Sequence, residues 1–185
     1  MDLLPPIPAW NAVHPIVVHF PIALLLTAPL LAIAAILIRR HRTGLAAATL
    51  ITLALGVAAA WLVVLSGEAG EDAAEAVAAA SAVLETHEER ATITTWIFTG
   101  AAAVYALLFL PTLRPAEKPT GRAWLAGNAL FLLAAGVGSL LLVSAGHEGG
   151  RLVHEFGVRA PIASTLDPGA PDAALHRDHD DSDDD

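Results

Sequence analysis

Histidine and carboxylate side chains must carry any metal or redox chemistry in this 185-residue chain, because it contains no cysteine. Neutral imidazole nitrogens bind haem iron, zinc and copper, and carboxylates join them in non-haem metal sites. Four histidines near the ends of long apolar runs are the main candidate cofactor ligands: His14, His19, His87 and His147. Three residues in similar places are weaker candidates for a metal ligand: Glu88, Glu68 and His154.

The first two histidines belong to the motif HPIVVHFP, residues 14–21, where an apolar run begins. Pro15 suits the first position of a helix, so His14 falls just outside the helix and His19 about one turn deeper. At about 100° per residue, the two side chains point roughly 140° apart. We therefore expect each to have its own partner on another helix, not to chelate one ion as a pair. The alternative is that both are structural, hydrogen-bonded to backbone or water at the membrane interface.

The acidic, alanine-rich segment of residues 67–91 predicts an amphipathic helix of about 18 residues outside the membrane. In such a helix Glu88 lies within about 20° of Val77 on the apolar stripe, and His87 lies at the edge of that stripe. A carboxylate there is costly unless a cation, a proton or a hydrogen-bond donor accompanies it. Glu88 is therefore the acidic residue most strongly indicated, unless the helix ends before it and leaves it in solvent.

Four apolar runs must position these side chains: residues 15–38, 45–66, 91–113 and 123–146. None of them contains Asp, Glu, Lys or Arg, and each exceeds the roughly 20 residues that cross a bilayer as a helix. No positive charge precedes the first run, which favours an uncleaved span over a signal peptide. The sequence therefore predicts an all-α membrane protein, a bundle of four transmembrane helices.

The charges predict the orientation of this bundle. The turns after the first and third runs hold six of the ten Lys and Arg residues: Arg39, Arg40, Arg42, Arg114, Lys118 and Arg122. By the positive-inside rule these turns face the cytoplasm, which places both termini on the periplasmic side of a bacterial inner membrane. All the candidate ligands then lie at the periplasmic face, at the ends of four different spans.

The fourth run is followed by three glycines, Gly146, Gly149 and Gly150, which predict the end of its helix. The short apolar stretch after them resembles a strand or a segment lying on the surface. The alternative to a ligand role for His147 is that it caps the helix end. The membrane domain is predicted over residues 1–161. Residues 162–185 are rich in Asp and His and predict a disordered acidic tail.

Other classes of function lack their signals. The serines have no convincing base arrangement, and the sequence contains no phosphate-binding loop for NAD or another nucleotide. Basic residues are too few and scattered for nucleic acid. Almost no ionisable group enters the spans, so a transport path is poorly supported. The sequence leaves open whether the protein is an enzyme, its oligomeric state and its partners, among which a membrane or periplasmic redox protein is a candidate.

Three segments together resemble the DUF2231 family of bacterial membrane proteins: HPIVVHFPIALL, SGEAGEDAAE with LETHEERA, and GHEGGRLVHEFGV. The resemblance extends to about Pro161 and implies a four-helix membrane domain. Some related proteins join this domain to Rieske or c-type cytochrome modules, which implies electron transfer. His14, His19, His87 and His147 fall on matching motif positions. Many relatives resemble LVYxHGV in the last motif, with an aromatic residue where this chain has His154, so the resemblance favours the other four histidines.

Three functions follow from these features. The first is electron transfer through b-type haem, with histidines from different helices as axial ligands. The second is a compact non-haem site for iron, zinc or copper, in which His14 or His19 joins His87, His147 and a carboxylate such as Glu88 or Glu68. The third is a structural or assembly subunit of a membrane complex, without a cofactor.

Overall fold

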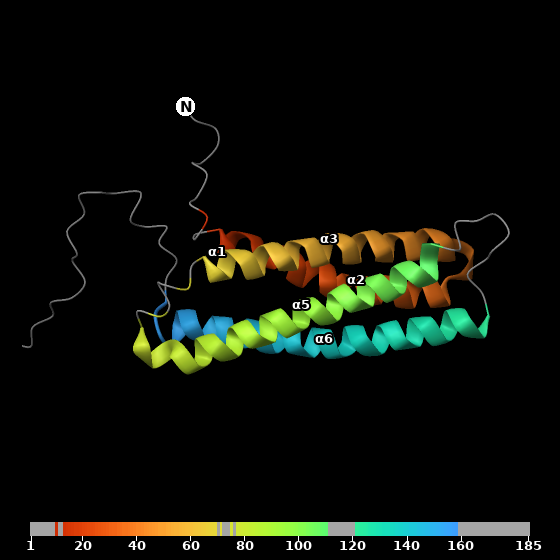
Figure 1. Cartoon of the computed structure of the whole chain (residues 1–185). Helices are drawn as coiled ribbons and strands as arrows, with labels where there is room; N and C mark the ends of the chain where they lie inside the picture. The colour runs from red at the N-terminus through yellow and green to blue at the C-terminus, as the bar shows by residue number, and fades with distance from the viewer. Residues whose placement is uncertain are drawn as a thin grey trace, which may run out of the picture.

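A computed structural model describes residues 10, 13–69, 71, 75, 77–110 and 121–158. Within these residues every regular element is helical. The helices are α1 (His14–Val17), α2 (His19–Leu37), α3 (Arg42–Glu68), α5 (Ser81–Phe109) and α6 (Arg122–His154), with short 3-10 turns η2 (Arg39–His41) and η3 (Ala78–Ala80). The long helices run up and down in an antiparallel four-helix bundle (Figure 1).

The bundle has two ends that differ in chemistry (Figure 1). At the first, which we call the histidine end, α1 begins, α3 ends, α5 begins and α6 ends. At the second, the arginine end, η2 joins α2 to α3 and α6 begins with Arg122. Four helical segments are long and apolar enough to cross a membrane: His14–Leu37, Arg39–Glu68, Ala78–Phe109 and Arg122–His154. This confirms the four predicted spans.

The helices carry apolar side chains on nearly every side, because their outer surfaces would contact lipid. Their backbone polar groups are paired within each helix and need no partner from the lipid. Leu107 and Leu140 are about three-quarters exposed on the outside of the bundle, where acyl chains would cover them. Inside, α2 packs mainly against α3, and α5 mainly against α6. The bundle therefore consists of two helical hairpins. The contact between the hairpins, through α3 with α5 and α2 with α6, is less extensive than the contact between the two helices of each hairpin.

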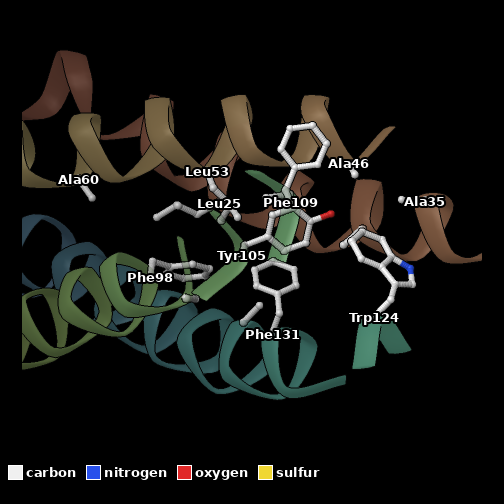
Figure 2. Close-up of a cluster of buried hydrophobic side chains, with 14 residues drawn as sticks. Leu25, Ala35, Ala46, Leu53, Ala60, Phe98, Tyr105, Phe109, Trp124 and Phe131 are labelled. Carbon is white, nitrogen blue, oxygen red and sulfur yellow. The ribbon is translucent and has the colours of Figure 1, made fainter. Parts of the chain in front are cut away.

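Aromatic side chains fill the space between the hairpins toward the arginine end. The rings of Tyr105 and Phe131 lie 4.8 Å apart between centroids in an edge-to-face arrangement, with Phe98 and Leu25 nearby (Figure 2). Phe98 and Leu25 in turn lie against glycines. A Cβ atom on Gly138 would lie 2.8 Å from Phe98 Cε2, and one on Gly56 would lie 2.7 Å from Leu25 Cδ2. Close helix packing therefore seals this part of the bundle.

We expect Gly138→Ala to destabilise the protein by about 1–3 kcal/mol, because the new methyl group overpacks against Phe98. The matched control is Gly136→Ala on the same helix, where a Cβ meets nothing within 4 Å. That change removes a flexible residue from an exposed helical position and stabilises by up to about 1 kcal/mol. Thermal unfolding in detergent compares the two, and equal melting temperatures would contradict the packing argument.

Two expectations about the histidine end are corrected. The glycines of residues 146–150 do not end α6, which continues to His154. A glycine inside a helix costs only about 1 kcal/mol, and contacts with α5 outweigh that cost. The segment after them is thus helical as far as His154, and His147 caps no helix end. The second correction concerns residues 81–90, which form the first turns of α5 and continue directly into the third span.

The separate amphipathic helix predicted between the second and third spans is not seen among the described residues. Most of residues 70–76, which would form its start, lie outside them. The predicted acidic tail of residues 162–185, the domain boundary near residue 161 and most of residues 1–12 also lie outside the described part of the chain.

Candidate functional site

A cavity of about 1050 Å³ opens at the histidine end, with walls from α1, α2, α3, α5 and α6. Its deeper wall is apolar and includes Leu25, Val63 and Leu142. All the candidate ligands except His147 line it: His14, His19, Glu68, His87, Glu88 and His154. His147 lies exposed on α6, outside the cavity lining. The fold thus gathers residues from four distant parts of the sequence around one space.

His14 is held between the first and second spans. It begins α1, is half-buried, and its Nδ1 lies 3.0 Å from the carbonyl oxygen of Val63 on α3. Gly67, one turn further along α3, lies directly against the imidazole, since a Cβ there would be 3.3 Å from His14 Nδ1. The glycine in the segment LSGE therefore leaves room for this ring.

His87 is held in the same way between α5 and α6. Its Nδ1 lies 2.8 Å from the carbonyl oxygen of Ala145, and it too is half-buried. A Cβ on Gly149 would lie 3.0 Å from His87 Cε1, so the ring rests on the bare backbone of α6. Gly149, which was expected to break the helix, instead makes the space that this histidine occupies.

The two imidazoles face each other from the two hairpins. Their ring centroids are 6.4 Å apart and their planes are inclined by 73°. A carbonyl oxygen can only accept a hydrogen bond, so Nδ1 of each ring carries the proton and donates. In the neutral form of each ring, Nε2 then keeps a lone pair. Histidines that bind metals through Nε2 are typically oriented by this second hydrogen bond.

The other histidines of the site are placed differently. His19 is exposed on α2 at the rim of the cavity, and His154 is exposed on the last turn of α6. His14 is thus half-buried and His19 exposed, although both line the same cavity. Among the described residues, no three His, Cys, Asp or Glu side chains are grouped closely enough to hold a metal ion.

Carboxylates line the cavity toward its mouth. Glu68 is exposed, Glu71 and Glu88 are half-buried, and all three contribute to the lining. Glu88 is close enough to Glu71 and Glu68 to be repelled by their charges. The lining residues that the structure describes include no Lys or Arg. The cavity therefore has a negative potential that favours cations and disfavours buried anionic groups.

An ion cluster joins α5 to α6 behind His87. Arg90 Nη1 donates to Glu148 Oε1 at 2.9 Å and to the Ser144 hydroxyl at 2.7 Å. Arg151 Nη1 donates to Glu148 Oε2 at 2.8 Å, and its Nε donates to Glu155 at 3.0 Å. The spacing of Glu148, Arg151 and Glu155 is visible in the sequence. Their link to Arg90 was missed, because only the tertiary fold brings α5 beside α6.

We expect Glu148→Gln to lower the melting temperature by several degrees, because the amide keeps the shape of the side chain but loses both ion pairs. The side chain of Glu148 is only 11% exposed, so water cannot fully replace these contacts. Glu155→Gln is the matched control. Glu155 is 53% exposed and, among the residues that the structure describes, pairs with Arg151 alone, so its loss should change stability little. Equal effects of the two variants would show that the cluster does not brace the helices.

The comparisons with known proteins agree with this architecture. The model of the DUF2231 family, described as predicted membrane proteins, matches residues 11–161. No curated protein and no solved structure matches the chain. The matched region contains the four apolar helices and every residue that lines the cavity. The chain is therefore a membrane protein that belongs to the DUF2231 family.

Proposed function

We propose that the cavity binds a b-type haem with His14 and His87 as its two axial ligands, and that the protein transfers electrons at one face of the membrane. The observation that carries this proposal is the pair of imidazoles facing each other across the gap between the hairpins, 6.4 Å apart between ring centroids. Haem iron held by two histidines exchanges single electrons without changing its ligands.

The spacing of the two rings supports this ligand pair. Two imidazoles on opposite sides of one iron, with each nitrogen about 2 Å from the metal, place their ring centres roughly 6 Å apart. The observed separation agrees with that value. A haem needs only two ligands from the protein because the porphyrin nitrogens occupy the other positions. The hydrogen bonds to Val63 and Ala145 fix the proton on Nδ1 of each ring and so direct Nε2 toward the ligand role.

The surroundings of the two rings also support a large, flat, apolar ligand. The cavity volume of about 1050 Å³ reaches the upper range of small-molecule sites in proteins. Its deeper wall is apolar and lies between the two hairpins. The hairpins contact each other less extensively than the two helices within each hairpin do. The arginines at the opposite end favour the cytoplasm for that end. The haem would then lie near the periplasmic face.

A non-haem metal ion is the second candidate, and the carboxylates at the mouth favour it. Haem propionates are anionic, so beside Glu68, Glu71 and Glu88 they would have to turn outward into solvent. A divalent cation would instead relieve the repulsion among these carboxylates. His14 or His87 with Glu88 would supply mixed nitrogen and oxygen ligands of the kind that iron and zinc accept. The structural subunit without a cofactor is the remaining alternative.

An absorption spectrum and a metal analysis of the same purified protein test these functions. The full chain is produced with haem precursor and iron, and it is purified in mild detergent without chelators. A Soret band with about one haem per chain supports the haem site. Stoichiometric iron, zinc or copper without that band supports the compact metal site. If neither is found, both cofactor proposals fail and the structural role is favoured.

A further inference from the structure

The turn at the arginine end surrounds a second, smaller cavity of about 380 Å³. Its lining is one continuous stretch of chain: Arg39, Arg40, His41, Arg42, Thr43, Gly44 and Leu45. Three of these side chains carry a full positive charge, and none of the seven is acidic. Its lining residues belong to η2 and the start of α3, at the arginine end, whereas His14 and His87 belong to the histidine end. The two ends lie at opposite ends of the bundle (Figure 1), so an inference from this cavity does not rest on the proposed function.

The arginines of this turn have different tasks. Arg42 donates from Nε to the carbonyl oxygen of Ala35 at 3.2 Å and from Nη2 to that of Ile36 at 3.3 Å. It therefore caps the last turn of α2 and fixes the shape of the turn. Arg39 and Arg40 lie exposed on η2, and among the described residues neither forms an ion pair with an acidic side chain. Their guanidinium groups are therefore available to a partner of opposite charge.

The level of this turn in the membrane indicates the partner. Leu37 and Ile38 are exposed apolar residues that end the first span, and Arg39 follows immediately. The arginines therefore begin where the acyl chains give way to the lipid headgroups. Gly44 lines the cavity and is exposed, and a Cβ on it would meet nothing within 4 Å, so the space beside it is open. A phosphate group is the anion that occurs at this level.

We infer that Arg39 and Arg40 form a binding site for the phosphate of an anionic phospholipid, which enters the cavity beside Gly44. The planar guanidinium group matches phosphate oxygens with two parallel hydrogen bonds, which a lysine ammonium cannot provide. Arg42 holds the turn in shape and contributes less to phosphate binding, because two of its N–H donors already bond to carbonyl oxygens of α2. The site holds lipid at one end of the protein, while the histidine cavity lies at the other.

Lipid retention by the purified full chain tests this site. The protein is reconstituted in nanodiscs of phosphatidylcholine with a minor fraction of phosphatidylglycerol, extracted into neutral detergent, and examined by native mass spectrometry. Wild-type protein should retain phosphatidylglycerol in preference to phosphatidylcholine. The double variant R39Q/R40Q should lower that retention by roughly tenfold or more, since each basic residue near the surface contributes to the attraction. The variant R39K/R40K should retain an intermediate amount.

Two controls separate this site from simpler explanations. Arg122→Gln removes a positive charge at the same end, where Arg122 is exposed at the start of α6, and should leave lipid retention nearly unchanged. If it lowers retention as much as R39Q/R40Q does, general charge attraction explains the binding and the site is wrong. Millimolar inorganic phosphate should not displace the lipid. If phosphate displaces it completely, the cavity binds the free anion and the lipid inference is overturned.

Discussion

His87→Ala and His14→Ala should each lower the haem bound per chain by roughly tenfold or more. In the proposed site, each variant would leave a bound haem with one protein ligand, because it removes the imidazole that one of the two hairpins contributes. The Soret band of the purified protein, normalised to protein absorbance at 280 nm, measures the effect. Because both histidines are half-buried at the end of the bundle, away from the aromatic core, the variants should still fold.

A matched control and a rescue make this result specific. His147→Ala removes an exposed histidine on α6 that does not line the cavity, and it should keep a full Soret band. His87→Gly leaves a space beside Gly149 that added imidazole can enter, and millimolar imidazole should restore the band. If His147→Ala abolishes the band while His87→Ala retains it, the ligand assignment is wrong.

Gly149→Ala should weaken haem binding without unfolding the protein, and this is the second large effect we expect. The new methyl group would lie 3.0 Å from His87 Cε1, so the ring must shift by a few tenths of an ångström, which disturbs its hydrogen bond to the carbonyl of Ala145. Loss of such an orienting contact typically costs 10–100-fold in affinity for a ligated metal. A titration of the purified, haem-depleted variant with haemin measures it. Gly67→Ala should act on His14 in the same way, more weakly, because the contact there is 3.3 Å.

A glycine on the same helix but outside the cavity supplies the control. Gly136 does not line the cavity, and a Cβ on it meets nothing within 4 Å, so Gly136→Ala should bind haem as the wild type does. It should also raise the melting temperature slightly, because alanine favours a helix more than glycine does. Equal weakening by Gly136→Ala and Gly149→Ala would mean that glycine flexibility, and not the space for His87, governs the site.

The elements that sequence reasoning placed well are those set by short-range rules. Four charge-free runs longer than a bilayer core predict four spanning helices, because only a helix pairs all its backbone groups within itself in lipid. That His14 and His19 do not chelate one ion as a pair stays a prediction from their angular separation on a helix. The side of the membrane that each end faces remains a prediction from the distribution of Lys and Arg.

The errors came from local signals that tertiary contacts override. Three glycines between residues 146 and 150 are typical of a helix end, yet α6 continues through them because α5 packs along this stretch. The weak cost of glycine in a helix is smaller than the gain from that packing. The acidic segment before the third span had the pattern of a separate helix. Residues 81–90 instead extend α5, because nothing in their sequence interrupts the hydrogen-bond ladder.

The sequence by itself determined that this is a four-span membrane protein, that six of its ten Lys and Arg residues lie in the two turns after the first and third spans, and which histidines and carboxylates could be ligands. Only the tertiary structure decided that His14 faces His87, that Gly67 and Gly149 make room for their rings, and that His147 stays outside the cavity. The physical reason is the distance along the chain over which each kind of interaction acts. Hydropathy and helical periodicity act within a few turns of one helix, whereas the partner of a histidine depends on how two hairpins pack together.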